Sequence, residues 1–299
     1  MVAPSPLSEA VAARRRVLRG LVAGLSVPVW SQAWAQTDED GELFAKIMAS
    51  GVLKVAIYKD DAPYSYVDGG EVKGLDADIA KALARNMGLG VQFLPFDAGE
   101  DMSADLRWMV EKGHYLGFGP ADLMMRVPVD RHLMFLNRKV LILSPYMSER
   151  PVLVLNTDKV PQLRLADDLK GLPLVGEKGT GLTSAMLGYG GGLLKEQVKI
   201  VSTGAEAVRM VARGEAVATY VTRAVAESAL HGLGQPSSHI ELMQMDMGTR
   251  AAQGWPIGVA IRAVNHPLRA AVEQAMAKLQ GSGELLTIFQ AHHLTFTTP

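Results

Sequence analysis

The stretch of residues 53–87 constrains the fold more than any other part of the chain. It starts with a β-prone run at 53–58, continues through a polar loop with two tyrosines, and ends in an amphipathic segment. In that segment Ile79, Leu83 and Met87 recur at helical spacing, and a glycine follows. The pattern predicts a strand, a loop with aromatic side chains and a helix. Loops at this end of a strand line the ligand crevices of open α/β sheets.

Strand and helix patterns alternate along most of the chain. Beyond the first unit, strand-like runs stand at 91–96, 122–127, 174–176, 198–202 and 216–221, and helix-like runs stand at 102–112, from about 182, at 205–212 and at 222–230. This order predicts parallel sheets in two similar α/β halves. A strand at 255–261 and two closing helices, at 267–279 and 284–291, complete the chain.

Residues 139–155 interrupt this alternation. They contain two β-like runs that are separated by Ser144-Pro145-Tyr146. We therefore expect two strands here, divided at the tripeptide.

The first 35 residues have the pattern of an export signal. A basic segment at 14–19 precedes a short apolar run at 20–30, and small residues favour cleavage after Ala35. The sequence Arg14-Arg15-x-Val17-Leu18 resembles the twin-arginine signal, so we expect a mature protein in the periplasm. An ordinary secretory signal or an uncleaved anchor is the alternative, although the apolar run is too short to span a bilayer.

Composition excludes several classes of function. The chain has no cysteine, so disulfides, thiolate catalysis and cysteine metal sites are excluded. Without residues 1–35 it keeps 26 basic and 30 acidic residues, a net charge of about −4, which argues against nucleic acid as a partner. The histidines, including the adjacent His292 and His293, lack metal-ligand spacing, and no phosphate loop or nucleophile elbow occurs. We therefore expect neither a metal nor a cofactor.

Short motifs along residues 51–291 occur in an order that resembles one protein family. They are Gly51-Val-Leu-Lys-Val-Ala56, Pro63-Tyr64-x-Tyr66, Gly74-Leu-Asp-Ala-Asp78, Ser144-Pro-Tyr146, Lys178-Gly-Thr180, Gly204-x-x-Ala207, Gly258-Val-Ala-Ile-Arg262 and Gly283-Glu-Leu-Leu. The family is that of the bacterial extracellular solute-binding proteins, family 3, the polar amino-acid type. The resemblance implies an α/β, two-lobed periplasmic-binding-protein type II fold, in which two hinge strands join the lobes and the solute lies between them.

The resemblance also implies domain boundaries and partners. Lobe one would consist of residues 36–148 plus 253–299, lobe two of 149–252, and the hinge strands would lie near 146–152 and 250–257. A monomer of this kind captures a small solute and presents it to the membrane permease of an ABC-type transporter. We therefore expect a binding protein and not an enzyme.

Two arginines are candidates for the group that holds a solute carboxylate. In the amino-acid binders this group is an arginine of the first lobe, because its planar guanidinium offers paired N–H donors. Arg126 stands at the expected crevice end of a strand, and Arg131 follows the same strand further along the chain. Gly179 and Thr180 resemble the second-lobe loop that offers backbone N–H groups and a hydroxyl to the same carboxylate.

The expected partner of a solute ammonium group is missing. Thr222 stands where the family has an acid, and a buried ammonium without a counter-charge would be costly. The sequence therefore favours a small anionic, carboxylate-bearing solute. Aromatic residues from separate segments complete the expected cleft: Tyr64, Tyr66, Tyr146, Tyr220 and Trp255. We interpret Asp76 and Asp78 as residues that cap or start the following helix, not as ligands.

Two other functions remain as alternatives. The segment 113–130 and the tail after His292 differ from ordinary family 3 sequences and look more like binding-protein relatives associated with periplasmic quinoprotein dehydrogenases and their cytochromes, which implies an accessory or interaction role. The remote alternative is a periplasmic dehydratase for prephenate-like acids, because some share this fold. Such an enzyme needs a general acid in the cleft, and its candidates by position are Asp122, Asp130 and Glu177.

Overall fold

The computed structural model describes residues 41–99, 101–114, 116–234, 238–248 and 253–299. The predicted export signal at 1–35 lies outside the described residues. Two five-stranded sheets dominate the fold, and a three-stranded antiparallel sheet accompanies the first of them. The small sheet consists of β2 (Asp60–Asp61), β3 (Ser65–Asp68) and β4 (Glu71–Lys73).

The first large sheet has the strand order β5-β1-β6-β13-β7. β1 (Val52–Tyr58) pairs in parallel with β5 (Gly90–Phe96) and β6 (Leu123–Pro128), whereas β13 (Trp255–Arg262) runs antiparallel to β6 and to β7 (Val140–Glu149). Alternate residues of β1 enter two different core layers, because successive side chains of a strand point to opposite faces. This burial on both faces explains why the first predicted strand is an almost continuous apolar run.

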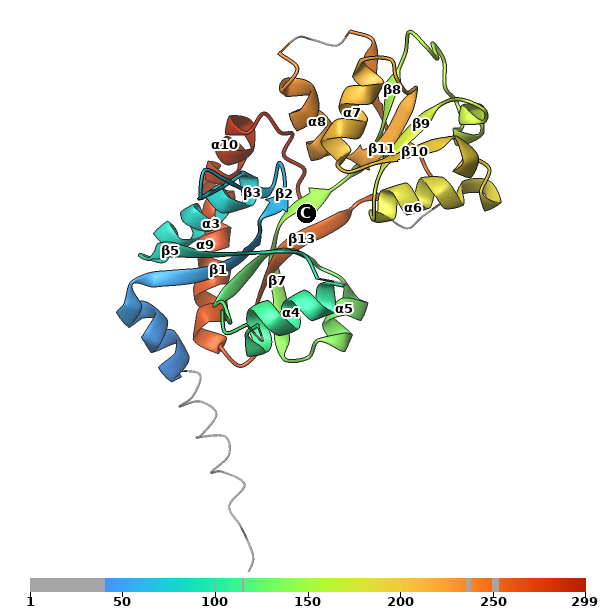
Figure 1. The fold of residues 1–299 in the computed structure, drawn as a ribbon. Coiled ribbons are helices and arrows are strands. Elements are labelled where there is room, and N and C mark those ends of the chain that lie inside the picture. The colour runs from blue at the N-terminus through green and yellow to red at the C-terminus, as the bar shows by residue number, and fades with distance from the viewer. Residues whose placement is uncertain (1–40, 100, 115, 235–237, 249–252) are drawn as a thin grey trace, which may run out of the picture. The chain divides into compact units, whose positions relative to one another are not determined.

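Helices cover both faces of the first sheet (Figure 1). On one face lie α3 (Leu75–Asn86), α9 (His266–Ser282) and α10 (Glu284–Ala291). On the other lie α4 (Met102–Leu106), the π-helical segment Arg107–Lys112 that continues it, and α5 (Arg131–Leu136). Residues 41–50 are also helical. The helices predicted at 102–112, 267–279 and 284–291 are therefore confirmed.

The second large sheet has the strand order β10-β9-β11-β8-β12. Its strands are β8 (Pro151–Asn156), β9 (Leu174–Glu177), β10 (Val198–Val201), β11 (Ala218–Thr222) and β12 (Ile240–Met243). α6 (Gly181–Gly188) packs on one face, and α7 (Gly204–Ala212) and α8 (Arg223–His231) pack on the other. Short 3-10 turns occur at Ala166–Leu169, Tyr189–Gly191 and Lys195–Gln197.

The chain passes between the two large sheets twice. β7 ends at Glu149 in the first sheet, and β8 begins at Pro151 in the second. β12 ends at Met243 in the second sheet, and β13 begins at Trp255 in the first. The first crossing falls within the segment 146–152 that the resemblance implied as a hinge, and the second proposed hinge includes the start of β13.

The break predicted at Ser144-Pro145-Tyr146 is wrong, because β7 continues through it. β7 is an edge strand that pairs only with β13, so Pro145 need not donate a backbone N–H. The pairing register shifts at this point, opposite Gly258. A Cβ atom at Gly258 would lie 2.4 Å from the carbonyl oxygen of Leu143, so this irregularity requires a glycine.

The C-terminal tail contacts a helix of the second sheet. Thr295 donates hydrogen bonds from its backbone N and from Oγ1 to the two carboxylate oxygens of Glu227 in α8, each at 2.7 Å. The imidazole of His293 stacks on that of His231 at the end of α8, with ring centroids 3.7 Å apart. The tail follows α10, which packs on the first sheet, so it links the two α/β halves.

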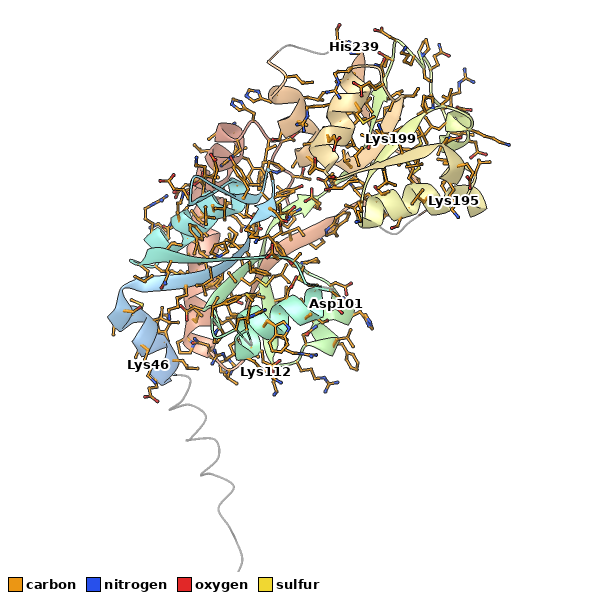
Figure 2. All side chains as sticks on the ribbon, viewed as in Figure 1. Lys46, Asp101, Lys112, Lys195, Lys199 and His239 are labelled. Atoms are coloured by element: carbon orange, nitrogen blue, oxygen red, sulfur yellow. The ribbon has the colours of Figure 1, made fainter. Side chains whose placement is uncertain are left out.

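Charged side chains are spread over the outer helices and loops, among them the exposed Lys46, Lys112 and Lys195 (Figure 2). Among the described residues, four of the nine exposed large hydrophobic side chains stand in two segments: Leu116 and Phe118 before β6, and Phe135 and Leu136 in α5. In the part of the chain that the structure describes, the helices are either too short or too polar to cross a membrane.

Candidate functional site

A cavity of about 210 Å³ lies between the two large sheets and takes its lining from both. The first half contributes Asp61, Tyr64, Arg126 and Trp255, and the second contributes Glu177, Thr180, Leu182, Tyr220, Val221, Thr222 and Val225. A larger cavity of about 600 Å³ lies among β7, α9, α10 and the tail, but Glu273 is the only charged residue that lines it. Ligand sites combine apolar walls with a few convergent polar groups, so the smaller cavity is the stronger candidate.

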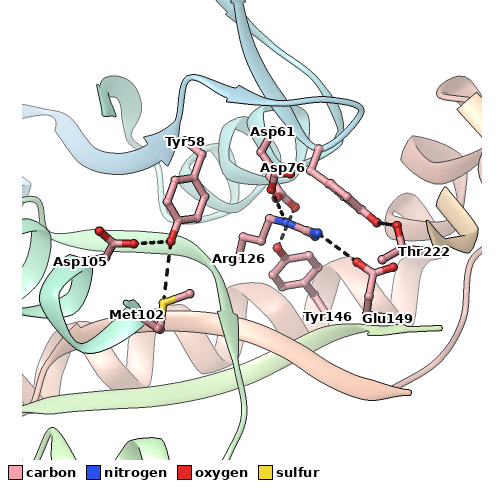
Figure 3. A network of polar contacts seen from close by, with 10 residues as sticks. Tyr58, Asp61, Asp76, Met102, Asp105, Arg126, Tyr146, Glu149 and Thr222 are labelled. Atoms are coloured by element: carbon pink, nitrogen blue, oxygen red, sulfur yellow. Dashed lines mark hydrogen bonds and ion pairs between the residues drawn. The ribbon is translucent and has the colours of Figure 1, made fainter. Parts of the chain in front are cut away.

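Arg126 is the central charge of this site. It lies in β6 with a positive φ of 61°, and its side chain is only 14% exposed. Its Nε donates to Oδ2 of Asp61 at 2.5 Å, and its Nη2 donates to Oε2 of Glu149 at 3.1 Å (Figure 3). The ring of Tyr64 covers the guanidinium, with 3.2 Å between Cζ and the ring centroid. Cations are attracted to aromatic faces at such distances.

Two of the three guanidinium nitrogens of Arg126 therefore have partners within the protein itself. Its remaining nitrogen, Nη1, is buried and has no hydrogen-bond partner among the described residues. Burial lowers the pKa of Arg126, but Asp61, Tyr64, Glu149 and Asp76 together hold that pKa well above its usual range. The prediction that Arg126 lies at the cavity agrees with its position in the lining, yet its donors already bind Asp61 and Glu149.

Tyr64 forms a hydrogen bond across the cavity. Its hydroxyl lies 2.8 Å from Oγ1 of Thr222, which stands at the end of β11 in the second sheet. The tyrosine side chain is almost fully buried, and this burial raises its pKa well above the ordinary value. Because the two hydroxyls come from different halves, the bond joins those halves at the cavity wall.

Asp76 belongs to a buried network behind Arg126. It stands in the first turn of α3, as expected of a helix-start residue, but it does not cap the helix. The N-cap of α3 is Gly74, and α3 has no side-chain cap. Asp76 instead accepts a hydrogen bond from the hydroxyl of Tyr146 at 2.7 Å, and both side chains are fully buried. Burial raises the pKa of Asp76 to about 7, although Arg126 and the Tyr146 hydrogen bond lower it. Oδ2 of Asp76 has no partner among the described residues.

Glu177 is the second acid that lines the cavity. It ends β9 in the second sheet and is half-buried. Burial raises its pKa, a hydrogen bond from the backbone of Gly204 lowers it, and the charge of Asp61 raises it again. No lysine, arginine or histidine among the described residues forms an ion pair with Glu177.

Five of the nine predicted ligand residues line the cavity: Tyr64, Arg126, Thr180, Thr222 and Trp255. Thr180 also serves as the N-cap of α6, where its Oγ1 accepts from the backbone N of Thr183 at 3.2 Å. Trp255 packs against core residues of both halves. Tyr220, named with the aromatic residues, lines the cavity too and donates its hydroxyl to the carbonyl of Met245.

The other four predicted ligand residues are not part of the lining. Arg131 is exposed at the start of α5, Tyr66 is half-buried in β3, and Gly179 is exposed next to Thr180. Tyr146 is fully buried against Asp76. Sequence alone does not separate these residues from the five above, because the contacts of their side chains depend on residues that are distant along the chain.

Three acids of the site were not identified as ligands from the sequence. Asp61 follows β1 and Glu177 ends β9, so the rule that crevices form at the carboxyl ends of strands could have selected both. Glu149 ends β7, but no such signal marked it in the sequence, because the β-like pattern of residues 139–155 was not expected to stop at that position. Among the described residues, no group of three or more His, Asp and Glu side chains has a geometry that could hold a metal ion.

Comparison with known proteins supports the fold. Residues 53–107 match the family model of the bacterial extracellular solute-binding proteins, family 3, which confirms the resemblance predicted from the motifs in that stretch. No curated protein sequence matches the chain significantly.

Solved structures match over most of the chain. An ancestral cationic amino acid solute-binding protein is 23% identical with a TM-score of 0.64, covering 83% of this chain and 98% of its own. A second structure, of an ancestral amino-acid-binding protein described as a precursor of cyclohexadienyl dehydratase, is 22% identical with a TM-score of 0.57 and the same coverage. An amino acid ABC transporter substrate-binding protein from Streptococcus pneumoniae, bound to L-arginine, is 21% identical with a TM-score of 0.58, covering 85% and 98%. These matches confirm the predicted two-lobed α/β fold.

Proposed function

We propose that this chain is a periplasmic binding protein that holds a small solute in the cavity between its two sheets and presents it to the permease of an ABC-type transporter. One observation carries the proposal: a cavity lined from both halves by Tyr64, Thr222 and Trp255, at the level where the chain crosses between the sheets. Binding proteins of this fold close two lobes on a ligand by a hinge. The family match at residues 53–107 supports the same role, and the pattern of residues 1–35 supports export.

The chemical class of the solute needs revision. The sequence favoured an anionic, carboxylate-bearing solute, with Arg126 or Arg131 as the group that binds it. Nε and Nη2 of Arg126 already donate to Asp61 and Glu149. Arg131 is exposed in α5 and is not part of the cavity lining. The proposed binding role therefore does not depend on a solute carboxylate.

Tryptophan fluorescence tests solute binding in the proposed cavity. Trp108 and Trp255 are the only tryptophans after residue 35, and of the two only Trp255 lines the cavity. In a Trp108→Phe variant, titration with amino acids, dicarboxylates, aromatic acids and amines is expected to give a saturable change in Trp255 emission for one class. The matched Trp255→Phe variant, which keeps Trp108, is expected to show no change. Saturable binding in calorimetry that leaves Trp255 emission unaltered would place the site elsewhere.

The accessory role in a dehydrogenase or cytochrome system is a second candidate. Leu116, Phe135 and Leu136 are exposed by 70%, 63% and 58%, and two of them stand together in α5. Exposed apolar side chains that gather on one part of a surface are typical of protein interaction sites. Co-purification of a quinoprotein dehydrogenase or a c-type cytochrome with the wild type, lost in Phe135→Ser, supports this candidate. Recovery of the same enzyme by both proteins would exclude Phe135 from the contact, and recovery by neither protein would contradict the accessory role.

The dehydratase alternative depends on a general acid in the cavity. Asp122 accepts a hydrogen bond from the backbone N of Lys54, and Asp130 caps α5 through the backbone N of Leu133. Neither residue lines the cavity, whereas Glu177 does. Binding without turnover is the function that we propose, and release of phenylpyruvate from prephenate would contradict it.

A further inference from the structure

The charges around the cavity are unbalanced. Among the described residues that line the cavity, Arg126 is the only basic one, and two acids, Asp61 and Glu177, line the same cavity. Glu149, which is only 2% exposed and is not part of the lining, also forms an ion pair with the guanidinium. Counted formally, three carboxylates surround one guanidinium: Asp61 and Glu149 share it as an ion-pair partner, and Glu177 forms no ion pair with a described residue. Buried charges are costly unless they are paired.

The two lining acids come from different halves. Asp61 lies in β2 of the first half, and Glu177 ends β9 of the second. The charge of Asp61 raises the pKa of Glu177, so the two carboxylates repel each other across the cavity. A positive group between them removes this repulsion and attracts both halves toward the same point, since charges of opposite sign stabilise one another most strongly in a partly desolvated site.

The remaining walls suit a small positive group. Trp255 offers an aromatic ring to the cavity, and aromatic faces attract ammonium and guanidinium groups. A solute carboxylate would meet few free donors, because two of the three guanidinium nitrogens of Arg126 bind acids and the Oγ1 of Thr180 donates to the carbonyl oxygen of Glu177. The volume of about 210 Å³ limits the solute to a small molecule.

We infer that the solute is an organic cation, an amine or a guanidine without a required carboxylate, and that Asp61 and Glu177 hold its positive charge from the two sides of the cavity. This inference rests on the proposed binding function and specifies its substrate class. It also accounts for the threonine at position 222, because Glu177 and Asp61 provide the negative charge that an acid was expected to provide there.

Calorimetry with matched probes tests the inference. The probes are 1,4-diaminobutane and agmatine as cations, 1,4-butanediol as the neutral analogue, succinate as the anionic analogue, and L-arginine and L-glutamate as amino acids. At pH 8 and low salt we expect saturable binding of 1,4-diaminobutane or agmatine, and none of butanediol or succinate. Glu177→Gln is expected to weaken amine binding about 10-fold to 100-fold, the effect of losing a charge-assisted contact. Glu196→Gln, the same change at an exposed glutamate away from the cavity, is expected to leave it unchanged.

The outcomes separate this inference from the function on which it rests. Binding of succinate, or of the amino acids alone, without binding of either amine would overturn the cation inference and leave the solute-binding function standing. If no probe binds and Trp255 emission stays constant across the wider panel, both are overturned. Equal amine affinity of Glu177→Gln and wild type would remove Glu177 from the site. If Glu177→Gln does not fold, the comparison of 1,4-diaminobutane with succinate on the wild type decides alone.

Discussion

Replacement of Arg126 by methionine is expected to destabilise the protein by about 3–5 kcal/mol near neutral pH, the usual effect of breaking a buried ion pair from one side. The loss leaves Glu149, 2% exposed, without the cation that lies 3.1 Å from its carboxylate. It also removes the pairing of Asp61, whose contribution is smaller because its side chain is 37% exposed. Urea unfolding followed by circular dichroism measures the change.

Three controls make this prediction specific. Arg131→Met, at the exposed start of α5, is expected to change the free energy of unfolding by less than about 0.5 kcal/mol. The double variant Arg126→Met, Glu149→Gln is expected to be more stable than Arg126→Met, because no buried charge is then left unpaired. The deficit of Arg126→Met should shrink as the pH falls, since protonation removes the charge of the unpaired carboxylates. A deficit that is the same at pH 5 and pH 8 would contradict the charge explanation.

Asp76→Asn is expected to remove a pH dependence of stability worth up to about 4 kcal/mol, the equivalent of roughly three pKa units. The pKa of this carboxyl rises from 3.8 to about 7 on folding, mainly because the side chain is fully buried. Below about pH 4 the carboxyl is protonated in both states and costs no stability. As the pH rises from about 4 to about 7, the carboxyl of Asp76 ionises in the unfolded chain but stays protonated in the folded protein. The stability that the protonated form contributes is therefore progressively lost.

The comparison of free energies of unfolding at pH 4 and pH 8 checks this prediction. Asparagine keeps an acceptor for the hydroxyl of Tyr146 and does not ionise. The free energy of unfolding of the variant is therefore expected to increase relative to that of the wild type as the pH rises. Asp158→Asn, at an exposed position, serves as the matched control and is expected to follow the wild type. If Asp76→Asn loses stability relative to wild type at pH 8, the carboxylate of Asp76 is stabilised by Arg126 more than it is penalised by burial.

Local patterns were sufficient to predict most of the fold. The apolar run at 53–58 lies in β1, and Ile79 and Leu83 lie in α3, with Met87 directly after its end. Both elements were predictable because burial on two faces and helical periodicity are encoded by neighbouring residues. The strand break at Ser144-Pro145-Tyr146 was wrong for a non-local reason. Whether proline is tolerated in β7 depends on the position of that strand at the edge of the sheet.

The site was harder to predict from the sequence, because its charged residues pair with partners that are far away along the chain. Arg126 meets Asp61, 65 residues away, and Glu149, 23 residues away. No periodicity connects such positions, so the sequence could not show that two of the three guanidinium nitrogens of Arg126 bind acids of the protein. The same limit applies to Asp76, because the first turn of a helix has the same residue pattern whether its acid caps the helix or is buried.

Amide hydrogen exchange of the full chain, with and without saturating 1,4-diaminobutane, tests the central claim that one solute is held from both halves. We expect slower exchange in residues 60–66, which include Asp61 and Tyr64, and in residues 176–183, which include Glu177 and Thr180. Protection confined to one half, or protection of α9 and α10 beside the larger cavity without any effect at those two segments, would contradict the claim.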